Sequence, residues 1–275
     1  MKPRASTLNI TLVQADLHWE DRQANLDMLS AMLSAPGEKM EVVVLPEMFS
    51  TGFSMHPQQL AEKMDGPTIQ WMKKQSAARG IILTGSLIAE ENGNFYNRLV
   101  WMLPNGEYGY YDKRHLFGYA GEDKAYTPGK KRLIASVKGW KLNLQICYDL
   151  RFPVWARQSL PVEPAAGEIA GPEYDILVYV ANWPEKRSHA WKTLLPARAI
   201  ENQCYVVGVN RTGIDGNGLP YSGDSMIVSP MGEIVTSAGA KAGLVTGQLQ
   251  AAELDRVRTG LPFLKDADPF MIGNQ

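Results

Sequence analysis

The sequence contains two short runs of purely apolar residues, 42–45 (Val-Val-Val-Leu) and 176–180 (Ile-Leu-Val-Tyr-Val). Such runs are typical of strands that are buried on both faces by covering helices. Amphipathic segments separate the runs, and the spacing of Leu26, Leu29 and Leu33 places these side chains on one face of a helix. The alternation predicts an α/β fold in which helices cover a mixed sheet system.

Polar and conformationally special residues indicate where these elements begin, turn and end. Thr68 and Gly80 are suited to begin and end a helix. The Pro-Asn-Gly sequence at 104–106 predicts a hairpin turn, and Pro196 is expected to kink a helix over 188–203. The other expected strands are 8–12, 81–89, 94–103, 107–112, 142–146, 205–209, 225–228, 234–236 and 244–248.

Composition and charge argue against several classes of protein. The 275 residues include 28 Lys and Arg against 29 Asp and Glu, which gives a net charge of −1. Without a basic excess, neither nucleic acid nor a membrane is an expected partner. No apolar run approaches the roughly 20 residues of a membrane-spanning helix. Because the two cysteines cannot build a disulfide scaffold and no signal peptide is readable, the predicted location is the cytoplasm.

Three residues with reactive side chains lie where apolar strands end: Glu47, Lys113 and Cys147. The end of a buried strand is rigid and opens into a cleft, which suits a catalytic group. A thiol, a carboxylate and an ammonium together can perform acyl transfer. The thiol is then the nucleophile, the carboxylate the base, and the ammonium stabilises the oxyanion.

Each of these residues also has a simpler interpretation. Cysteine is among the most buried residue types, so Cys147 could be an inert core residue, as Cys204 is expected to be. Glu47 could cap a loop, and Lys113 could form an exposed ion pair. His115 could instead pair with Cys147 as in papain-like enzymes, which would leave Glu47 and Lys113 without roles. The histidines and cysteines show no metal-ligand spacing, so no metal site is expected.

Considered together, three segments carry a more specific signal: 45–49 (Leu-Pro-Glu-Met-Phe), 111–117 (Tyr-Asp-Lys-Arg-His-Leu-Phe) and 147–153 (Cys-Tyr-Asp-Leu-Arg-Phe-Pro). They resemble, in order and in residues, the nitrilase superfamily of carbon–nitrogen hydrolases. Within that superfamily the chain looks most like the bacterial omega-amidases, which hydrolyse the side-chain amide of 2-oxo acids. Further matching segments are 182–184, 197–203, 223–225 and 229–233.

The resemblance implies a fold and an assembly. The fold would be a four-layer α–β–β–α sandwich formed by one domain over residues 1–275. Its core would span about 7–250, and a C-terminal tail would follow at 251–275. A homodimer or higher homo-oligomer is expected, and no metal or organic cofactor is required.

The resemblance also implies roles for four residues. Glu47 would be the general base, Lys113 the oxyanion partner and Cys147 the nucleophile. The family has a second glutamate between the lysine and cysteine motifs, which Glu122 matches best; its alternative is a solvated charge in a loop. The expected reaction is hydrolysis of a small linear amide, 2-oxoglutaramate or 2-oxosuccinamate, through a thioester on the cysteine.

Four further residues are candidates for substrate binding. Tyr148 would offer its backbone N–H to the oxyanion, and Trp183 lies in a matching motif. Arg187 is expected to pair with the substrate carboxylate, because its planar guanidinium matches that group. Arg151 could do the same, but an ion pair with Asp149 is the alternative.

Two other functions stay open at this point. A nitrilase or an N-carbamoyl hydrolase would share the same three reactive groups and differ only in substrate. A non-catalytic binding protein or a thiol redox protein would use Cys147 merely as a reactive thiol.

Overall fold

Two six-stranded sheets form the centre of the computed structural model, which describes residues 3–35, 37–158, 171–268 and 270–273. The first sheet has the strand order β14-β1-β2-β3-β4-β5, and the second has the order β13-β12-β9-β8-β7-β6. In the first sheet the strands are β1 (Thr7–Gln14), β2 (Val42–Val44), β3 (Ile82–Glu91), β4 (Asn94–Met102), β5 (Tyr108–Asp112) and β14 (Gly243–Gln250). In the second they are β6 (Leu133–Val137), β7 (Trp140–Ile146), β8 (Ile176–Ala181), β9 (Tyr205–Asn210), β12 (Met226–Val228) and β13 (Ile234–Ser237).

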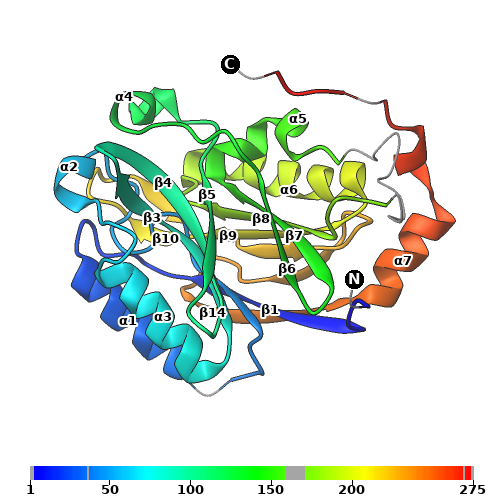
Figure 1. The fold of residues 1–275 in the computed structure, drawn as a ribbon, viewed down its shortest axis with the longest axis horizontal. Helices are drawn as coiled ribbons and strands as arrows, with labels where there is room; N and C mark the ends of the chain where they lie inside the picture. Colours follow the sequence, from blue (N-terminus) through cyan, green and yellow to red (C-terminus); the bar gives the residue numbers. More distant parts are fainter. Residues whose placement is uncertain (1–2, 36, 159–170, 269, 274–275) are drawn as a thin grey trace.

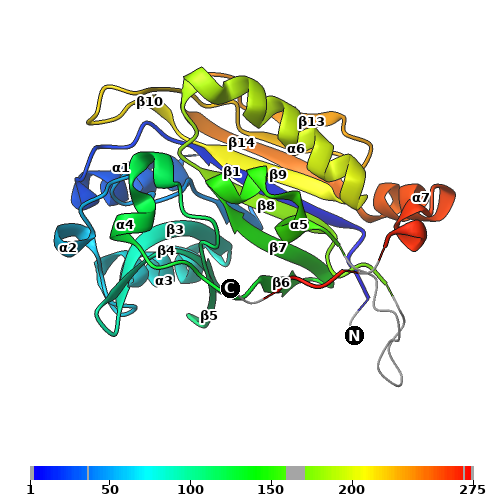
Figure 2. The same cartoon turned by 90° about the horizontal axis from the view of Figure 1, so that it is seen from above.

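Helices cover the outer face of each sheet (Figures 1 and 2). The helices α1 and α3 lie beside the first sheet, whereas α5 and α6 lie over the second. The helices are α1 (Arg22–Ser34), α2 (Pro57–Leu60), α3 (Pro67–Arg79), α4 (Glu122–Ala125), α5 (Pro153–Ala156), α6 (Ser188–Asn202) and α7 (Ala251–Gly260), with 3₁₀ turns at Gly118–Ala120, Cys147–Arg151, Glu185–Arg187 and Phe263–Asp266. A separate hairpin consists of β10 (Thr212–Ile214) and β11 (Pro220–Ser222).

The apolar runs of the sequence explain why the sheets are stacked. Side chains alternate in direction along a strand, so a strand that is apolar throughout can pack on both faces. In β2, Val42 and Val44 belong to the core between the sheets, and Val43 packs toward α1 and α3. In β8, Val178 lies between the sheets and Leu177 packs toward α6. The result is the expected four-layer α–β–β–α sandwich.

The direction of the strands gathers functional groups at one edge. Strands β1, β2 and β3 run parallel, as do β7, β8 and β9. The carboxyl ends of neighbouring parallel strands lie at the same edge of a sheet, where α/β proteins bind ligands. The segments that follow β2, β5, β7 and β8 carry Glu47, Lys113, Cys147 and Asn182.

Several local expectations need correction. Thr68 is not the helix cap: Gly66 holds that position, Pro67 begins α3, and the Thr68 hydroxyl donates to Glu62. By contrast, the expected helix over 188–203 is present as α6, with Pro196 inside it. The sequence did not predict β6, β10, β11, α2 and α4, nor that the segment 251–275 contains α7.

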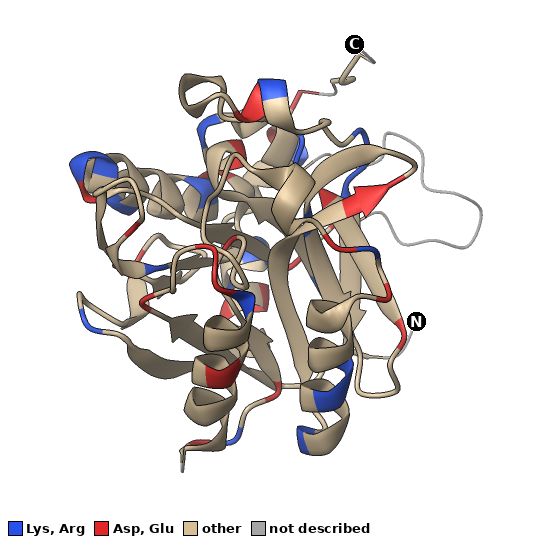
Figure 3. Cartoon of the chain, turned by 90° about the vertical axis from the view of Figure 1, so that its left-hand side faces the viewer, with Lys and Arg blue, Asp and Glu red and all other residues tan. Residues whose placement is uncertain are grey.

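Basic and acidic residues are interspersed along the chain in the ribbon of Figure 3. None of the described helices is long and apolar enough to span a membrane.

Candidate active site

Cys147 occupies a sharp turn at the end of β7. It is half-buried and begins the 3₁₀ turn Cys147–Arg151 with a φ of 44°. A non-glycine residue with positive φ is uncommon, and such conformations cost on the order of 1–3 kcal/mol and cluster at functional sites. The turn presents the thiol at the edge of the sheet instead of burying it in the next strand position.

Asp149 holds this turn in place. One of its oxygens accepts hydrogen bonds from the Tyr111 hydroxyl at 2.7 Å and the Ile146 N–H at 3.0 Å. The other lies 3.0 Å from the backbone nitrogen and 2.8 Å from Nδ1 of His115. The fully buried Asp149 has four hydrogen bonds of this kind and forms no ion pair with Arg151, so that alternative is wrong.

His115 belongs to this support and not to the thiol. Its ring stacks on Phe152 at a centroid distance of 3.9 Å and pairs with Asp149. Among the hydrogen bonds of the described residues, none joins His115 to Cys147, and His115 does not line the cavity beside the thiol. The papain-like alternative therefore has no geometric support.

A buried cluster of charged and amide groups lies next to Cys147; we call Glu47, Lys113, Glu122 and Asn97 the Glu–Lys cluster. Lys113 Nζ is 2.8 Å from Oε1 of Glu47, 2.8 Å from Oε2 of Glu122 and 3.0 Å from its Oε1. The side chains of all three charged residues are fully buried. Glu122 is thus not the solvated loop charge that the sequence left open. Asn97, on β4, donates to both carboxylates.

Burial and the charges of the cluster shift the pKa values of Lys113, Glu122 and Cys147. Burial alone lowers the pKa of Lys113, but Glu122 and Glu47 outweigh it, so the pKa rises and the lysine stays an ammonium. Burial raises the pKa of Glu122 and Lys113 opposes that shift. Burial and the negative charge of Glu47 raise the pKa of the Cys147 thiol well above its usual value. The thiol is therefore protonated at neutral pH, and a base would have to remove this proton for the sulfur to act as a nucleophile.

The carboxylates of Glu122 and Glu47 differ in how many further hydrogen bonds they can accept. Each oxygen of an ionised carboxylate accepts about two hydrogen bonds. Glu122 uses all four positions: two for Lys113, one for Asn97, and one for the Phe117 N–H at 2.6 Å. Glu47 Oε1 accepts from Lys113 and Asn97, whereas Oε2 accepts only one N–H from the described backbone, that of residue 182. Oε2 of Glu47 thus has a lone pair left for a proton.

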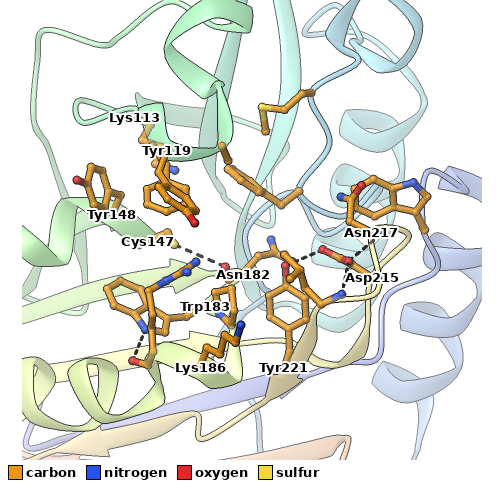
Figure 4. Close-up of a pocket in the computed structure, with 18 of the residues that line it drawn as sticks. Lys113, Tyr119, Cys147, Tyr148, Asn182, Trp183, Lys186, Asp215, Asn217 and Tyr221 are labelled. Atoms are coloured by element: carbon orange, nitrogen blue, oxygen red, sulfur yellow. Dashed lines mark hydrogen bonds between the residues drawn. The ribbon is translucent and has the colours of Figure 1, made fainter.

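A cavity of about 430 Å³ opens beside Cys147 (Figure 4). The thiol Sγ lies 3.9 Å from the carbonyl oxygen of Asn182, which follows β8. Tyr148 and Trp183 line the same cavity. Four residues proposed from the sequence, Lys113, Cys147, Tyr148 and Trp183, therefore border one space.

Cationic side chains also line the cavity. The Arg151 guanidinium lies 5.0 Å above the Trp183 ring, and the Arg187 guanidinium lies 5.2 Å above the Phe117 ring. Lys186 is a third cation on this wall. Among the described residues, none of these three cations has an acidic partner within ion-pair distance. The wall can therefore accept a small anion.

The hairpin β10–β11 supplies another wall that the sequence did not predict. Asp215 lines the cavity, and its oxygens accept from the Asn217 and Leu219 backbone N–H groups and from the Tyr221 hydroxyl. Figure 4 shows Asp215 and Tyr221 across the cavity from Tyr148. Three of the carboxylate's hydrogen-bonding positions are thus already used within the hairpin.

Sequence reasoning also missed Asn97, because it lies within a strand and no strand end or turn marks it. Asn182 was part of a matching segment but had no assigned role. Its backbone N–H donates to Glu47 Oε2 at 2.8 Å, and its side-chain nitrogen donates to the Glu47 carbonyl at 2.5 Å. Among the described residues, no group of three or more His, Cys, Asp and Glu side chains could hold a metal ion.

Comparison with known proteins agrees with this architecture. The family model of carbon–nitrogen hydrolases matches residues 9–259. The chain belongs to the carbon–nitrogen hydrolase family. It is therefore an enzyme that hydrolyses carbon–nitrogen bonds, and the expected family and fold are both confirmed.

Individual relatives cover nearly the whole chain. The omega-amidase YafV of Yersinia enterocolitica is 40% identical over 268 residues, which cover 97% of this chain and 99% of that protein. The 2-oxoglutaramate amidase of Bacillus subtilis is 31% identical, with coverages of 94% and 96%. The crystal structure of XC1258 from Xanthomonas campestris, a CN-hydrolase superfamily protein with an arsenic adduct in its active site, matches with a TM-score of 0.94. It is 42% identical and covers 98% of this chain and 100% of that chain.

Proposed function

We propose that this enzyme hydrolyses the omega-amide of a small 2-oxo dicarboxylic acid, 2-oxoglutaramate or 2-oxosuccinamate, to the acid and ammonia. The observation that carries the proposal is the arrangement around Cys147. A protonated thiol adjoins the buried Glu47 carboxylate, which has one unused lone pair, and the thiol itself borders a cavity with a cationic wall. The names of the omega-amidase and 2-oxoglutaramate amidase relatives support this choice of substrate.

In the first half of the reaction, Cys147 Sγ attacks the amide carbonyl carbon. The S–H bond breaks, its proton moves to Oε2 of Glu47, and an S–C bond forms. The carbonyl π electrons move to the oxygen and form an oxyanion. When the tetrahedral intermediate collapses, the C–N bond breaks and the nitrogen takes the proton from Glu47. Ammonia leaves and a thioester remains on the thiol.

The oxyanion needs donors that are already oriented toward it. Lys113 supplies a fixed positive charge at the cavity, and the Tyr148 backbone N–H follows the nucleophile directly. All three hydrogens of the ammonium have carboxylate acceptors within 3.0 Å. A change from two bonds to one bond with Glu122 frees one N–H for the oxyanion.

Water completes the reaction. Glu47 accepts a proton from a water molecule that attacks the thioester carbonyl, and the C–S bond breaks. The proton returns to the sulfur and the acid is released. Because every hydrogen-bonding position of Glu122 is used, this residue acts as a positioning group for Lys113 and not as a second base.

The cationic wall gives the substrate its orientation. An omega-amide of a 2-oxo acid has a carboxylate at the end remote from the scissile amide. We assign this carboxylate to Arg187, with Arg151 as a second donor. The rings of Trp183 and Phe117 hold these guanidinium groups over the cavity, and 430 Å³ is enough space for a five-carbon substrate.

A substrate panel tests the proposal. We expect ammonia release from 2-oxoglutaramate and 2-oxosuccinamate, with a much lower kcat/KM for a short nitrile and for an N-carbamoyl amino acid. A preference for either of the last two would replace the omega-amidase assignment with a nitrilase or N-carbamoyl hydrolase activity. No turnover of any compound, with ready oxidation of Cys147, would favour a thiol redox protein.

A further inference from the structure

Asn97 contacts every charged member of the Glu–Lys cluster. It is fully buried on β4, opposite Ile88 of β3. Its side-chain nitrogen lies 2.8 Å from Oε1 of Glu47 and 3.1 Å from Oε1 of Glu122. Its backbone carbonyl accepts the Lys113 N–H at 3.0 Å. One strand residue thus connects both carboxylates and the lysine.

The charges of its neighbours determine how the Asn97 amide is oriented. Its oxygen Oδ1 has no hydrogen-bond partner among the described residues. A reversed amide would aim the lone pairs of this oxygen at two ionised carboxylates, which can only accept. The nitrogen therefore faces the carboxylates, and each of its two N–H bonds has one acceptor.

The amide stabilises negative charge without adding positive charge. Two ionised carboxylates and one ammonium give the buried cluster a net charge of −1. Hydrogen bonds donated to an ionised carboxylate favour its charged form. A second ammonium in place of Asn97 would also favour it, but would cancel the negative charge that attracts the thiol proton.

The same contacts decide where a transferred proton can bind. Oε1 of Glu47 accepts two N–H donors, and so does Oε1 of Glu122. Neither oxygen has a lone pair left for a proton. We propose that Asn97 is a positioning residue: it keeps Oε1 of both glutamates free of protons and thereby directs the Cys147 proton to Oε2 of Glu47. This inference rests on the proposed role of Glu47 as the base.

The test compares pH profiles of the purified enzyme and its Asn97→Leu variant. The acid limb of kcat/KM reports ionisation of the base in the free enzyme. Without the two N–H donors, we expect this limb to move to higher pH by about one unit, the shift expected when a carboxylate loses a hydrogen bond to its charged form. The rate of Cys147 alkylation by iodoacetamide should show the same shift. Asn143→Leu is the matched control, because Asn143 is a buried strand asparagine whose side chain has no partner among the described residues.

The isosteric variant Asn97→Asp gives a second, opposite readout. A carboxyl group at this position keeps its proton at low pH and can still donate one hydrogen bond. Above the pKa of this new carboxyl group, the ionised side chain no longer donates a hydrogen bond and repels both glutamates. Activity should therefore fall as the pH rises through that pKa, and we expect the basic limb of the profile to move to lower pH. A folded Asn97→Leu variant whose rate falls equally at every pH, or an Asn97→Asp variant with the wild-type basic limb, would overturn the inference.

The alkylation profiles keep this inference separate from the proposed substrate. If the wild-type enzyme released no ammonia from any amide, the proposed function would fail. A displaced alkylation profile in the Asn97 variants would nevertheless support the positioning role, and an undisplaced one would refute it.

Discussion

Replacing Lys113 with methionine removes the only ammonium of the Glu–Lys cluster. Methionine is unbranched like lysine, so it fills much of the same space without a charge. Two fully buried carboxylates, Glu47 and Glu122, then face each other without their cation. Removing one partner of a buried ion pair costs about 3–5 kcal/mol in the free energy of unfolding. The loss of an oxyanion donor should lower the acylation rate by a further hundred- to thousandfold.

The stability loss should depend on pH. A carboxyl group whose pKa is higher in the folded state than in the unfolded state contributes stability at low pH, which is lost as the pH rises through the folded-state pKa. Burial already raises the pKa of Glu122 above 4.5 with the lysine present, and loss of the cation raises it further. The deficit of Lys113→Met relative to wild type should therefore be largest near neutral pH and decrease as the pH falls toward 4.5.

Urea unfolding at about pH 5 and about pH 7.5 measures this deficit. The control is the double variant Lys113→Met with Glu122→Gln, which removes one of the two unpaired charges. It should be more stable than the sum of the single effects predicts, with a coupling of about 0.5–3 kcal/mol. Additive losses, or a deficit that does not change with pH, would refute the electrostatic reasoning. A normal kcat with a raised KM would move Lys113 to a substrate-binding role.

Two further changes test the substrate wall and the second cysteine. Arg187→Met should raise KM for 2-oxoglutaramate about 10- to 100-fold, as expected for the loss of a charged hydrogen bond, and hardly affect butyramide; the exposed Arg256→Met serves as control. Equal losses on charged and neutral amides would exclude a carboxylate contact. Cys204→Ala should keep wild-type kcat, because Cys204 is fully buried in the core beneath α6; a large loss of kcat in a folded variant would contradict this.

The parts of the site that follow strand ends were predictable from the sequence. Glu47, Lys113 and Cys147 come directly after or within a few residues of β2, β5 and β7. Strand periodicity indicates where such strands end, and parallel strands bring their carboxyl ends together. The reactive residues could therefore be identified before their mutual distances were known.

The remaining parts depend on side-chain contacts that no local pattern encodes. Asn97 points toward the cluster from the middle of β4, and a polar residue within a strand usually indicates an exposed face. Asp149 forms hydrogen bonds with Tyr111 and His115 and not with the nearby Arg151, which lies above Trp183. These side-chain contacts depend on how the two sheets and their loops pack.

Glu122 illustrates the difference between motif and geometry. In the sequence, Glu122 stands beside a second acidic residue, Asp123, and spacing alone does not show which of the two side chains is buried. In the structure Glu122 is fully buried and bonded to Lys113, whereas Asp123 is exposed. The 3₁₀ turn at Gly118–Ala120 precedes α4, and Glu122 is the first residue of α4 and its buried one.

The central claim is that the reaction proceeds through a thioester on Cys147, and mass spectrometry of an acid-quenched reaction tests it most directly. During turnover of 2-oxoglutaramate, the peptide that contains Cys147 should gain the mass of the substrate minus ammonia. The Cys204 peptide of the same sample should stay unmodified and serves as an internal control. An adduct on Cys204, or steady turnover without any adduct under conditions in which deacylation limits the rate, would contradict the account.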